Sequence, residues 1–339
     1  MGVRIINLMG AEMTALLKDR FGERVDVVEV EPDAVVDDEL AGDVLLAPGR
    51  AAGRPSPAWL ADVAQRGVAW VHVAGANVGD VPAAVFDDGR LVTCSRGSMA
   101  TPISEFVLAS ILAFEKRFPH SWLSEPIDGW GFQGRLDPSA APGEPVMRPP
   151  LHWGLANLGT LEGKVLGIFG FGSIGRAAAA KALPFGMRVV AVRRSGAPSG
   201  MDGVEIVDLP EMAAVADHLV LCAPSTPATE RIIDDRVFER TKPTAHLVNV
   251  GRGTLVDQDA LIRALDEDRL AFASIDTADP EPLPAGHRLY SHPKVHLSPH
   301  ISWCSPSQQR RTAEIVVGNV ESFLDGRPLH GVVDPDNRY

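Results

Sequence analysis

Glycines in the middle of the chain have the spacing of a phosphate-binding turn. They form a G-x-G-x-x-G pattern at Gly170, Gly172 and Gly175. The first permits a tight turn, the second leaves room for a pyrophosphate, and the third lets a helix pack close to a strand. Ser173 and Ile174 would begin that helix, whose free N–H groups and positive dipole face the phosphates. Because the apolar run 165–169 precedes the pattern and an alanine-rich stretch follows it, the pattern predicts dinucleotide binding.

Two arginines follow the next predicted strand, 188–192, where such domains select their cofactor. An NAD site usually has Asp or Glu there, because a carboxylate accepts hydrogen bonds from the ribose hydroxyls. This chain has Arg193 and Arg194 instead, and planar guanidinium groups suit a 2′-phosphate. We therefore expect NADP to be preferred, with NAD possible. The alternative is that both arginines are solvated surface residues.

Polar residues also gather in three later segments, each of which follows or ends a predicted strand. These segments are 247–257 with Arg252, 274–284 with Asp276 and Glu281, and 297–303 with His300 and Trp303. In open α/β sheets, ligands bind at the carboxyl ends of strands. We therefore expect these segments to contribute to one site.

The elements that must position these residues alternate between strand and helix. In the first hundred residues the predicted strands are 3–8, 25–30, 44–47, 68–73 and 91–93, and the helices are 11–20 and 57–65. This alternation predicts a parallel sheet with helices on both faces. Apolar residues at helical spacing then predict a long amphipathic helix over 101–118.

Residues 119–162 break the alternation. They contain many prolines and glycines and several aromatic residues, and we interpret them as a wrap-around connection. The alternation restarts with strands 165–169, 188–192, 218–222, 246–249, 272–276 and 295–297, and with helices 174–183 and 258–266. A last helix, 306–324, closes the chain.

Composition limits the classes of partner. The 339 residues are 45 % apolar and 22 % charged, with a net charge of −12, which is typical of a globular protein. An excess of acid repels nucleic acid and anionic membrane, so we expect neither as a partner. The three cysteines, Cys94, Cys222 and Cys304, lack metal-binding spacing. We therefore expect no metal site and a reducing, cytoplasmic location.

Taken together, the ordered motifs resemble the D-isomer-specific 2-hydroxyacid dehydrogenase family, and within it the glyoxylate/hydroxypyruvate reductases. The resemblance spans most of the chain and includes the segments beginning at Thr101, Ala182 and Ala223. It implies an α/β fold with two doubly wound parallel-sheet domains. A Rossmann NAD(P)-binding domain, 118–299, would be inserted into a flavodoxin-like substrate domain, 1–117 plus 300–339.

The resemblance also assigns roles. Arg252 matches the family's site arginine, which would bind the substrate carboxylate and polarise its carbonyl. His300 matches the acid/base histidine, and the imidazole of histidine exchanges protons near neutrality. Glu281 would fix its tautomer and favour the imidazolium. Asp276 would hold the nicotinamide amide. Further cofactor contacts are expected at Pro224, Thr229 and Val250.

The predicted substrate pocket departs from the family pattern. Residues 71–79 correspond to the family loop that binds the substrate carboxylate, here with Ala76, Asn77 and Val78. Asn77 stands where a glycine is usual, although Asn also tolerates positive φ. Trp303 would line the pocket or its wall, with core packing as the alternative.

The resulting expectation is an oxidoreductase that transfers a hydride between NAD(P)H and C2 of a small 2-oxo or 2-hydroxy acid. The favoured reaction is reduction to the D-2-hydroxy acid. Family resemblance implies a homodimer, with the 101–118 helix and residues 119–162 at the interface. The alternative is a catalytically weak NAD(P)-sensing regulatory or co-repressor-like protein on the same fold.

Overall fold

The computed structural model describes residues 2–35, 40–49, 55–75, 78, 81–118 and 158–335. The chain divides into two compact units, a first unit of Met1–Pro102 with Trp303–Tyr339 and a second unit of Ile103–Ser302. Helix α3 (Ala100–Lys116) begins in the first unit and continues in the second. The domain borders expected from the sequence, 117/118 and 299/300, put the whole helix in the substrate domain, and that assignment remains a prediction.

The first unit contains a five-stranded parallel sheet with the order β2-β1-β3-β4-β5, the doubly wound order of flavodoxin-like folds. Its strands are β1 (Val3–Asn7), β2 (Val25–Glu29), β3 (Val44–Pro48), β4 (Trp70–Ala74) and β5 (Leu91–Cys94). Its helices are α1 (Ala11–Phe21), α2 (Pro57–Ala64) and α8 (Pro306–Leu324). The strands are apolar and β-branched because both faces of this sheet are covered.

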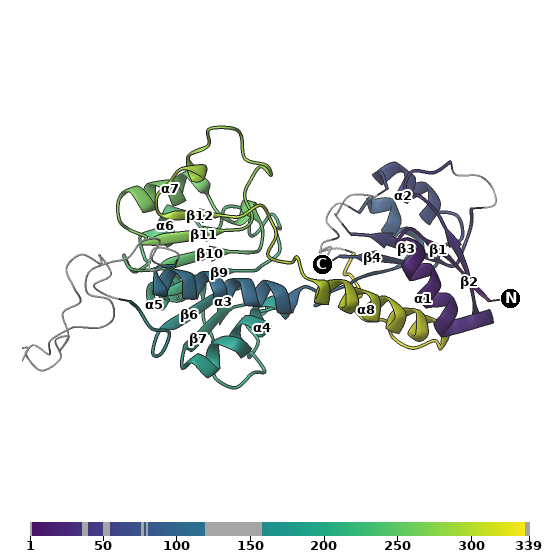
Figure 1. Cartoon of the computed structure of the whole chain (residues 1–339), viewed down its shortest axis with the longest axis horizontal. Coiled ribbons are helices and arrows are strands. Elements are labelled where there is room, and N and C mark those ends of the chain that lie inside the picture. The colour runs from purple at the N-terminus through teal and green to yellow at the C-terminus, as the bar shows by residue number, and fades with distance from the viewer. Residues whose placement is uncertain are drawn as a thin grey trace, which may run out of the picture. The chain divides into compact units, whose positions relative to one another are not determined.

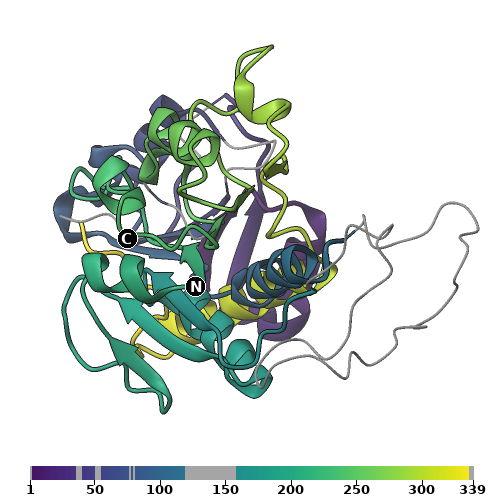
Figure 2. The same ribbon diagram turned by 90° about the vertical axis from the view of Figure 1, so that its left-hand side faces the viewer.

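Helices α1 and α8 pack on one face of this sheet, and α2 packs on the other. Leu17 of α1 and Val316 of α8 are fully buried in one core cluster with Trp70 of β4. The two helices run side by side in both views (Figures 1 and 2). Arg20 bonds Glu321 across them at 3.2 Å. Helix α8 is thereby held against helix α1.

The second unit contains a seven-stranded parallel sheet with the order β12-β11-β10-β9-β6-β7-β8. This is the Rossmann order with one added strand, and it confirms the predicted α/β fold with a Rossmann-type domain inserted in the first. The strands are β6 (Val165–Phe169), β7 (Arg188–Val192), β8 (Val204–Ile206), β9 (His218–Leu221), β10 (His246–Asn249), β11 (Phe272–Ile275) and β12 (Val295–Leu297). Its helices besides α3 are α4 (Ser173–Ala182), α5 (Leu209–Val215), α6 (Asp235–Phe238) and α7 (Gln258–Asp266).

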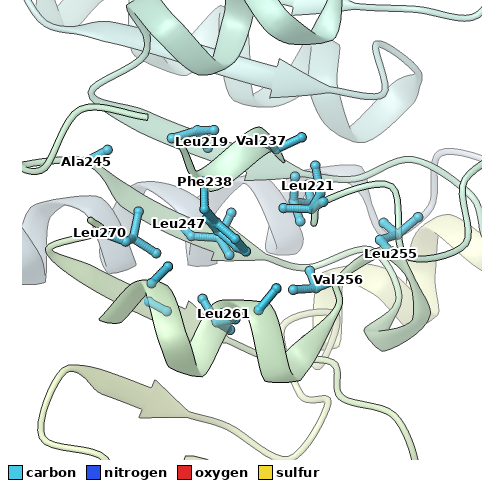
Figure 3. Packing of buried hydrophobic residues seen from close by; sticks show 14 of the residues in the cluster. Leu219, Leu221, Val237, Phe238, Ala245, Leu247, Leu255, Val256, Leu261 and Leu270 are labelled. Carbon is cyan, nitrogen blue, oxygen red and sulfur yellow. The ribbon is translucent and has the colours of Figure 1, made fainter. Parts of the chain in front are cut away.

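A large apolar core lies between this sheet and helices α5, α6 and α7. Phe238 of α6 lies over Leu247 of β10, with Leu261 of α7 nearby (Figure 3). All three are at most 1 % exposed, and burying such a side chain stabilises the fold by about 1.5–3 kcal/mol. This core makes the sheet a rigid platform for the loops at its edge.

Strand β8 and helices α5 and α6 were not among the elements predicted from sequence. Strand β8 has three residues and α6 has four, which is too short for a period to emerge. The start of helix α5 could have been predicted, because Asp208 stands three residues before Glu211. In the structure Asp208 is the N-cap, and its side chain accepts a hydrogen bond from the N–H of Glu211. That spacing is a helix-start signal.

An ionic cluster is buried on the sheet face next to α3. Glu115 of α3 lies 2.8 Å from Lys164 Nζ and 3.1 Å from His218 Nε2. Burial alone would raise the pKa of Glu115, but the hydrogen bonds from His218 and Lys164 outweigh burial and hold the pKa below its ordinary value. Burial holds the pKa of the neighbouring His246 well below its ordinary value. Phe114 stacks on that imidazole, with ring centroids 4.6 Å apart.

The first unit also buries a histidine, His72 of β4, between two hydroxyl groups. Its Nδ1 lies 2.7 Å from Thr93 Oγ1 and its Nε2 lies 2.9 Å from Ser95 Oγ. Trp70 Nε1 donates to the same Thr93 oxygen at 2.8 Å. Burial lowers the pKa of His72 to about 3. The imidazole is therefore held neutral, as a hydrogen-bonded part of the core.

Some predictions fall on residues outside the described part of the chain. Most of the wrap-around connection, residues 119–157, and the substrate-loop residues Ala76 and Asn77 are among them. Within the described residues, no helix combines the length and apolar character needed to cross a membrane.

Candidate active site at the strand ends of the second unit

The carboxyl ends of neighbouring strands in the second unit form one edge of the sheet. Strands β12, β11, β10, β9, β6 and β7 are adjacent in that order and all parallel. The loops that leave this edge carry Gly170, Arg193, Pro224, Arg252, Asp276 and His300. The sheet order thus brings these predicted segments of the chain to one edge, as the sequence pattern indicated.

The glycine turn after β6 has the geometry that a phosphate-binding turn requires. Gly170 has φ +102°, and a Cβ there would lie 2.5 Å from the Ala223 nitrogen. At Gly175 a Cβ would lie 2.5 Å from the Gly170 carbonyl oxygen. Gly172 differs, because no described atom lies within 4 Å of the Cβ position there. The first and third glycines therefore permit close packing, whereas the second faces open space.

Helix α4 begins directly at this open position. Gly172 is its N-cap, and a glycine has no side chain with which to cap the first N–H groups. Ser173 is exposed and Ile174 half-buried in the first turn. Cys222 Sγ donates to the Gly170 carbonyl at 2.9 Å, and burial raises the pKa of this thiol to about 12. The turn and helix terminus therefore fit a dinucleotide pyrophosphate.

The loop after β7 is held by two arginines. Arg176 of α4 donates to the carbonyl oxygens of Ser199 at 2.6 Å and Gly200 at 3.2 Å. Arg193 Nη1 donates to the Pro198 carbonyl oxygen at 3.0 Å. Arg193 is half-buried, whereas Arg194 is exposed. Part of the Arg193 guanidinium thus shapes the loop, and Arg194 is the more accessible cation at the predicted 2′-phosphate position.

The loop after β9 lies beside the glycine turn. Thr229 Oγ1 donates to the Pro224 carbonyl oxygen at 2.8 Å and accepts from the Thr226 N–H at 2.8 Å. The buried Val250, just after β10, donates its N–H to the Leu221 carbonyl at 3.1 Å. All the residues predicted for this part of the cofactor site therefore lie on adjoining loops.

His300 and Glu281 form a direct pair. His300 Nδ1 lies 2.9 Å from Glu281 Oε2, and both side chains are partly exposed. The other carboxylate oxygen of Glu281 accepts the N–H of Ala278 at 3.2 Å. A carboxylate at Nδ1 accepts a hydrogen bond from a proton on that atom and so fixes the tautomer and the orientation of the ring. Nε2 is then the ring atom placed for proton exchange with a substrate.

Arg252 stands on a loop that Asn249 organises. The buried Asn249 donates from Nδ2 to the carbonyl oxygens of Arg252 at 3.0 Å and Thr277 at 3.3 Å. Its Oδ1 accepts the N–H of Gly251 at 3.1 Å. The guanidinium of Arg252 bonds the Gly251 carbonyl oxygen at 2.6 Å and is half-buried. One amide thus joins the loop of Arg252 to the loop that leads to Glu281.

Asp276, predicted as a nicotinamide ligand, has its carboxylate directed into the protein. It is 1 % exposed. Its oxygens accept from Ser298 Oγ at 2.6 Å, the Ile301 N–H at 3.0 Å and the Ser302 N–H at 2.9 Å. Each carboxylate oxygen has two acceptor positions, so these bonds do not exclude the predicted cofactor contact.

Apart from Arg252, which is in the second unit, the predicted substrate residues belong to the first unit or lie outside the described residues. Val78 is buried there. Trp303, where the chain returns from the second unit to the first, is half-buried. Three supporting residues of the second unit, Arg176, Asn249 and Gly253, received no role in the sequence analysis. Asn249, Arg252 and Gly253 form an N-x-x-R-G pattern in the sequence. The spacing of Asn249 and Gly253 around Arg252 could have indicated that they shape its loop.

The chemistry open to this site is proton exchange at His300, at a sheet edge whose loops also carry Arg252 and a turn that fits a dinucleotide. Among the residues that the structure describes, no cluster of three His, Cys, Asp or Glu side chains could hold a metal ion. The fold and site therefore define the class of Rossmann-type proteins that combine a dinucleotide turn with a His–Glu pair.

Comparison with known proteins places the chain within that class. The family model "D-isomer specific 2-hydroxyacid dehydrogenase, NAD binding domain" matches residues 152–302. Glyoxylate reductase of Thermococcus litoralis is 31 % identical over 250 residues, which are 73 % of this chain and 71 % of that protein. The chain belongs to the D-isomer specific 2-hydroxyacid dehydrogenase family.

Other relatives match over shorter segments. The human glyoxylate reductase/hydroxypyruvate reductase is 34 % identical over 172 residues, which are 50 % of this chain and 52 % of that protein. The matched segment spans about half the length of most of the curated relatives.

Solved structures resemble the whole chain. A D-isomer specific 2-hydroxyacid dehydrogenase family protein from Aeromonas salmonicida is 27 % identical with a TM-score of 0.73, covering 99 % of this chain and 100 % of that one. The D-mandelate dehydrogenase of Rhodotorula graminis is 25 % identical with a TM-score of 0.78, covering 98 % of each chain. Both units thus have counterparts within one family.

Proposed function

We propose that this protein reduces a small 2-oxo acid to the D-2-hydroxy acid with NADPH as the preferred reductant. The observation that carries the proposal is the His300–Glu281 pair, with Nδ1 and Oε2 2.9 Å apart, at the sheet edge that also carries Arg252 and the glycine turn. Membership of the family supports the reaction class. The relatives named glyoxylate reductase make a short 2-oxo acid the first substrate to test.

In this proposal each side chain has a separate task. The bound dinucleotide supplies the hydride for C2. Arg252 binds the substrate carboxylate with its guanidinium and polarises the neighbouring carbonyl. His300 donates a proton from Nε2 to the carbonyl oxygen and recovers it in the reverse direction. Glu281 holds the ring through Nδ1 and stabilises the imidazolium before transfer.

The preference for NADPH rests on the loop after β7. Arg193 and Arg194 stand where NAD-specific domains usually have an acidic residue, and Arg194 is exposed there. The pyrophosphate would be held by the open position at Gly172 and the first N–H groups of α4. NAD remains usable because that part of the site is common to both dinucleotides.

The test is oxidation of NADPH and NADH with a panel of 2-oxo acids that includes glyoxylate and hydroxypyruvate. Wild type and His300→Ala are compared at saturating cofactor. Turnover with NADPH that falls by at least about a hundredfold in His300→Ala supports the proposal, since general acid catalysis contributes about 10²–10⁴.

Tight NADPH binding without turnover on any acid would contradict the proposal and favour the alternative, a nucleotide-sensing regulatory protein. Equal turnover in wild type and His300→Ala would remove the histidine from the mechanism. The homodimer expected from the family is a separate proposal, which light scattering after size exclusion tests. A monomer at micromolar concentration would refute it.

A further inference from the structure

The side chain of Asp276 accepts hydrogen bonds from residues on both sides of His300 in the loop that follows β12. Its buried carboxylate accepts from Ser298 Oγ at 2.6 Å on one side, and from the N–H groups of Ile301 at 3.0 Å and Ser302 at 2.9 Å on the other. Hydrogen bonds to an ionised acceptor are short and about twice as strong as neutral ones. The carboxylate therefore fixes the backbone that precedes and follows His300.

The backbone of His300 needs such support. Its φ is +55°, and a residue with a Cβ pays about 1–2 kcal/mol in the left-handed region. Backbone of this kind persists only when its surroundings over-determine it. The His300 N–H donates to the main-chain carbonyl of Asp276 at 2.9 Å. Asp276 thus holds this residue through its main chain and the neighbours through its side chain.

The same residue anchors the loop of Glu281. The Asp276 N–H donates to the Asn249 carbonyl at 2.9 Å, and the next residue, Thr277, accepts from Asn249 Nδ2 at 3.3 Å. Asp276 is therefore the point from which the loops of both His300 and Glu281 are positioned. A shift of either loop would change the Nδ1–Oε2 distance of the acid–base pair.

We propose that Asp276, with Ser298 as its hydroxyl partner, is a positioning residue that presents His300 to Glu281 in the geometry for proton transfer. The proposal rests on the proposed function, because it assigns His300 the proton. It differs from the nicotinamide contact implied by family resemblance. A positioning role acts on kcat, whereas a cofactor contact acts first on the affinity for NADPH.

Ser298→Ala is the more specific test of the positioning role, since it removes one hydrogen-bond donor to Asp276 and leaves the carboxylate itself intact. Asp276→Asn is the stronger variant, because Ile301 and Ser302 donate to different carboxylate oxygens and the amide nitrogen that replaces one of these oxygens cannot accept a hydrogen bond. Ser274→Ala is the matched control. It removes a buried hydroxyl from β11, the strand that Asp276 follows, but that hydroxyl bonds His246 at 2.9 Å, away from the loop.

Three quantities are measured on the full-length protein. Amide hydrogen exchange of the peptide covering 298–302 is followed without cofactor, NADPH affinity by fluorescence, and kcat with its solvent deuterium isotope effect in turnover. For Ser298→Ala we expect faster exchange and NADPH affinity within twofold of wild type. We also expect a kcat lower by about tenfold, within the hundredfold that a displacement of about 1 Å can cost, and a larger isotope effect.

Weaker NADPH binding with unchanged kcat at saturation in Ser298→Ala and Asp276→Asn would overturn the proposal. Unchanged exchange in 298–302 would also overturn it, as would a loss of kcat in Ser274→Ala equal to that in Ser298→Ala. A wild type without turnover would instead refute the proposed function. The exchange experiment would then still decide whether Asp276 holds the loop.

Discussion

Gly253 is the position where a single added methyl group should separate the loop of Arg252 from the loop of Glu281. A Cβ at Gly253 would lie 2.5 Å from the nitrogen of Asp279 and closer still to the carbonyl group of Ala278. These atoms are backbone, so no side-chain rotation relieves the contact. Gly253 follows Arg252 directly, and Ala278 donates its N–H to Glu281. Gly253→Ala therefore forces apart the loops that carry Arg252 and Glu281.

The size of the effect follows from that distance. The Ala278 carbonyl carbon is the closest atom to the added Cβ, and carbon atoms pack at about 3.5 Å, so the 278–279 backbone must move by more than about 1 Å. Such a displacement costs up to about a hundredfold in rate, and overpacking costs about 1–3 kcal/mol of stability. We expect kcat/KM with NADPH and a 2-oxo acid to fall by about one to two orders of magnitude.

Steady-state kinetics and NADPH fluorescence titration check this expectation. NADPH affinity should change little, because the glycine turn lies on another strand. Gly318→Ala in α8 is the control, since no described atom lies within 4 Å of its Cβ position and alanine in a helix gains up to about 1 kcal/mol over glycine. A Gly253→Ala protein with wild-type kcat would refute the reasoning that close approach of these loops sets the site.

Two further predictions concern charge. Arg194→Ala should raise KM for NADPH by about tenfold, the loss of one charge-assisted bond, and leave KM for NADH unchanged in initial-rate assays; an equal change for both cofactors would contradict the 2′-phosphate role. The imidazole of His72 is neutral in the folded protein, with a pKa of about 3, whereas in the unfolded chain it has the ordinary pKa of about 6.5. As the pH drops from about 6.5 to about 3, the unfolded chain therefore binds a proton at His72 that the folded protein does not, and the free energy of unfolding falls. Between pH 7 and 5 this residue should cost wild type about 2 kcal/mol that His72→Gln does not lose, as denaturant unfolding followed by the fluorescence of the buried Trp70 would measure; parallel pH curves for the two proteins would contradict this.

The sequence contained most of the fold because the elements are regular. Helix α8 was predicted with the bounds that the structure has, since Ser305 caps it and Pro306 suits its first turn. Inner strands such as β3 are nearly continuous apolar runs, as is typical of a parallel sheet covered on both faces. Strand β8 was missed because it is a three-residue edge strand, where side chains are half exposed and carry no pattern.

The site was predictable in its residues but not in its geometry. Strand periodicity placed Arg252, Glu281 and His300 just after strands, and parallel order then brings those ends to one edge. The inward direction of the Asp276 carboxylate depends on loop torsions that no periodicity encodes. The role of Asn249, which joins two loops through one amide, likewise needs both loops in view.

The glycine turn, Arg252, Glu281 and His300 all fall within one uninterrupted stretch of the second unit. The chain passes between units only at 102/103 and 302/303. A chimaera joined at these two points would therefore exchange residues 71–79, where substrate selection is expected, in a single block. Under the proposed function, such an exchange between family members would keep the residues assigned to hydride and proton transfer together while replacing the residues expected to select the acid. If the chimaera is active, selectivity and reactivity can diverge independently in this architecture.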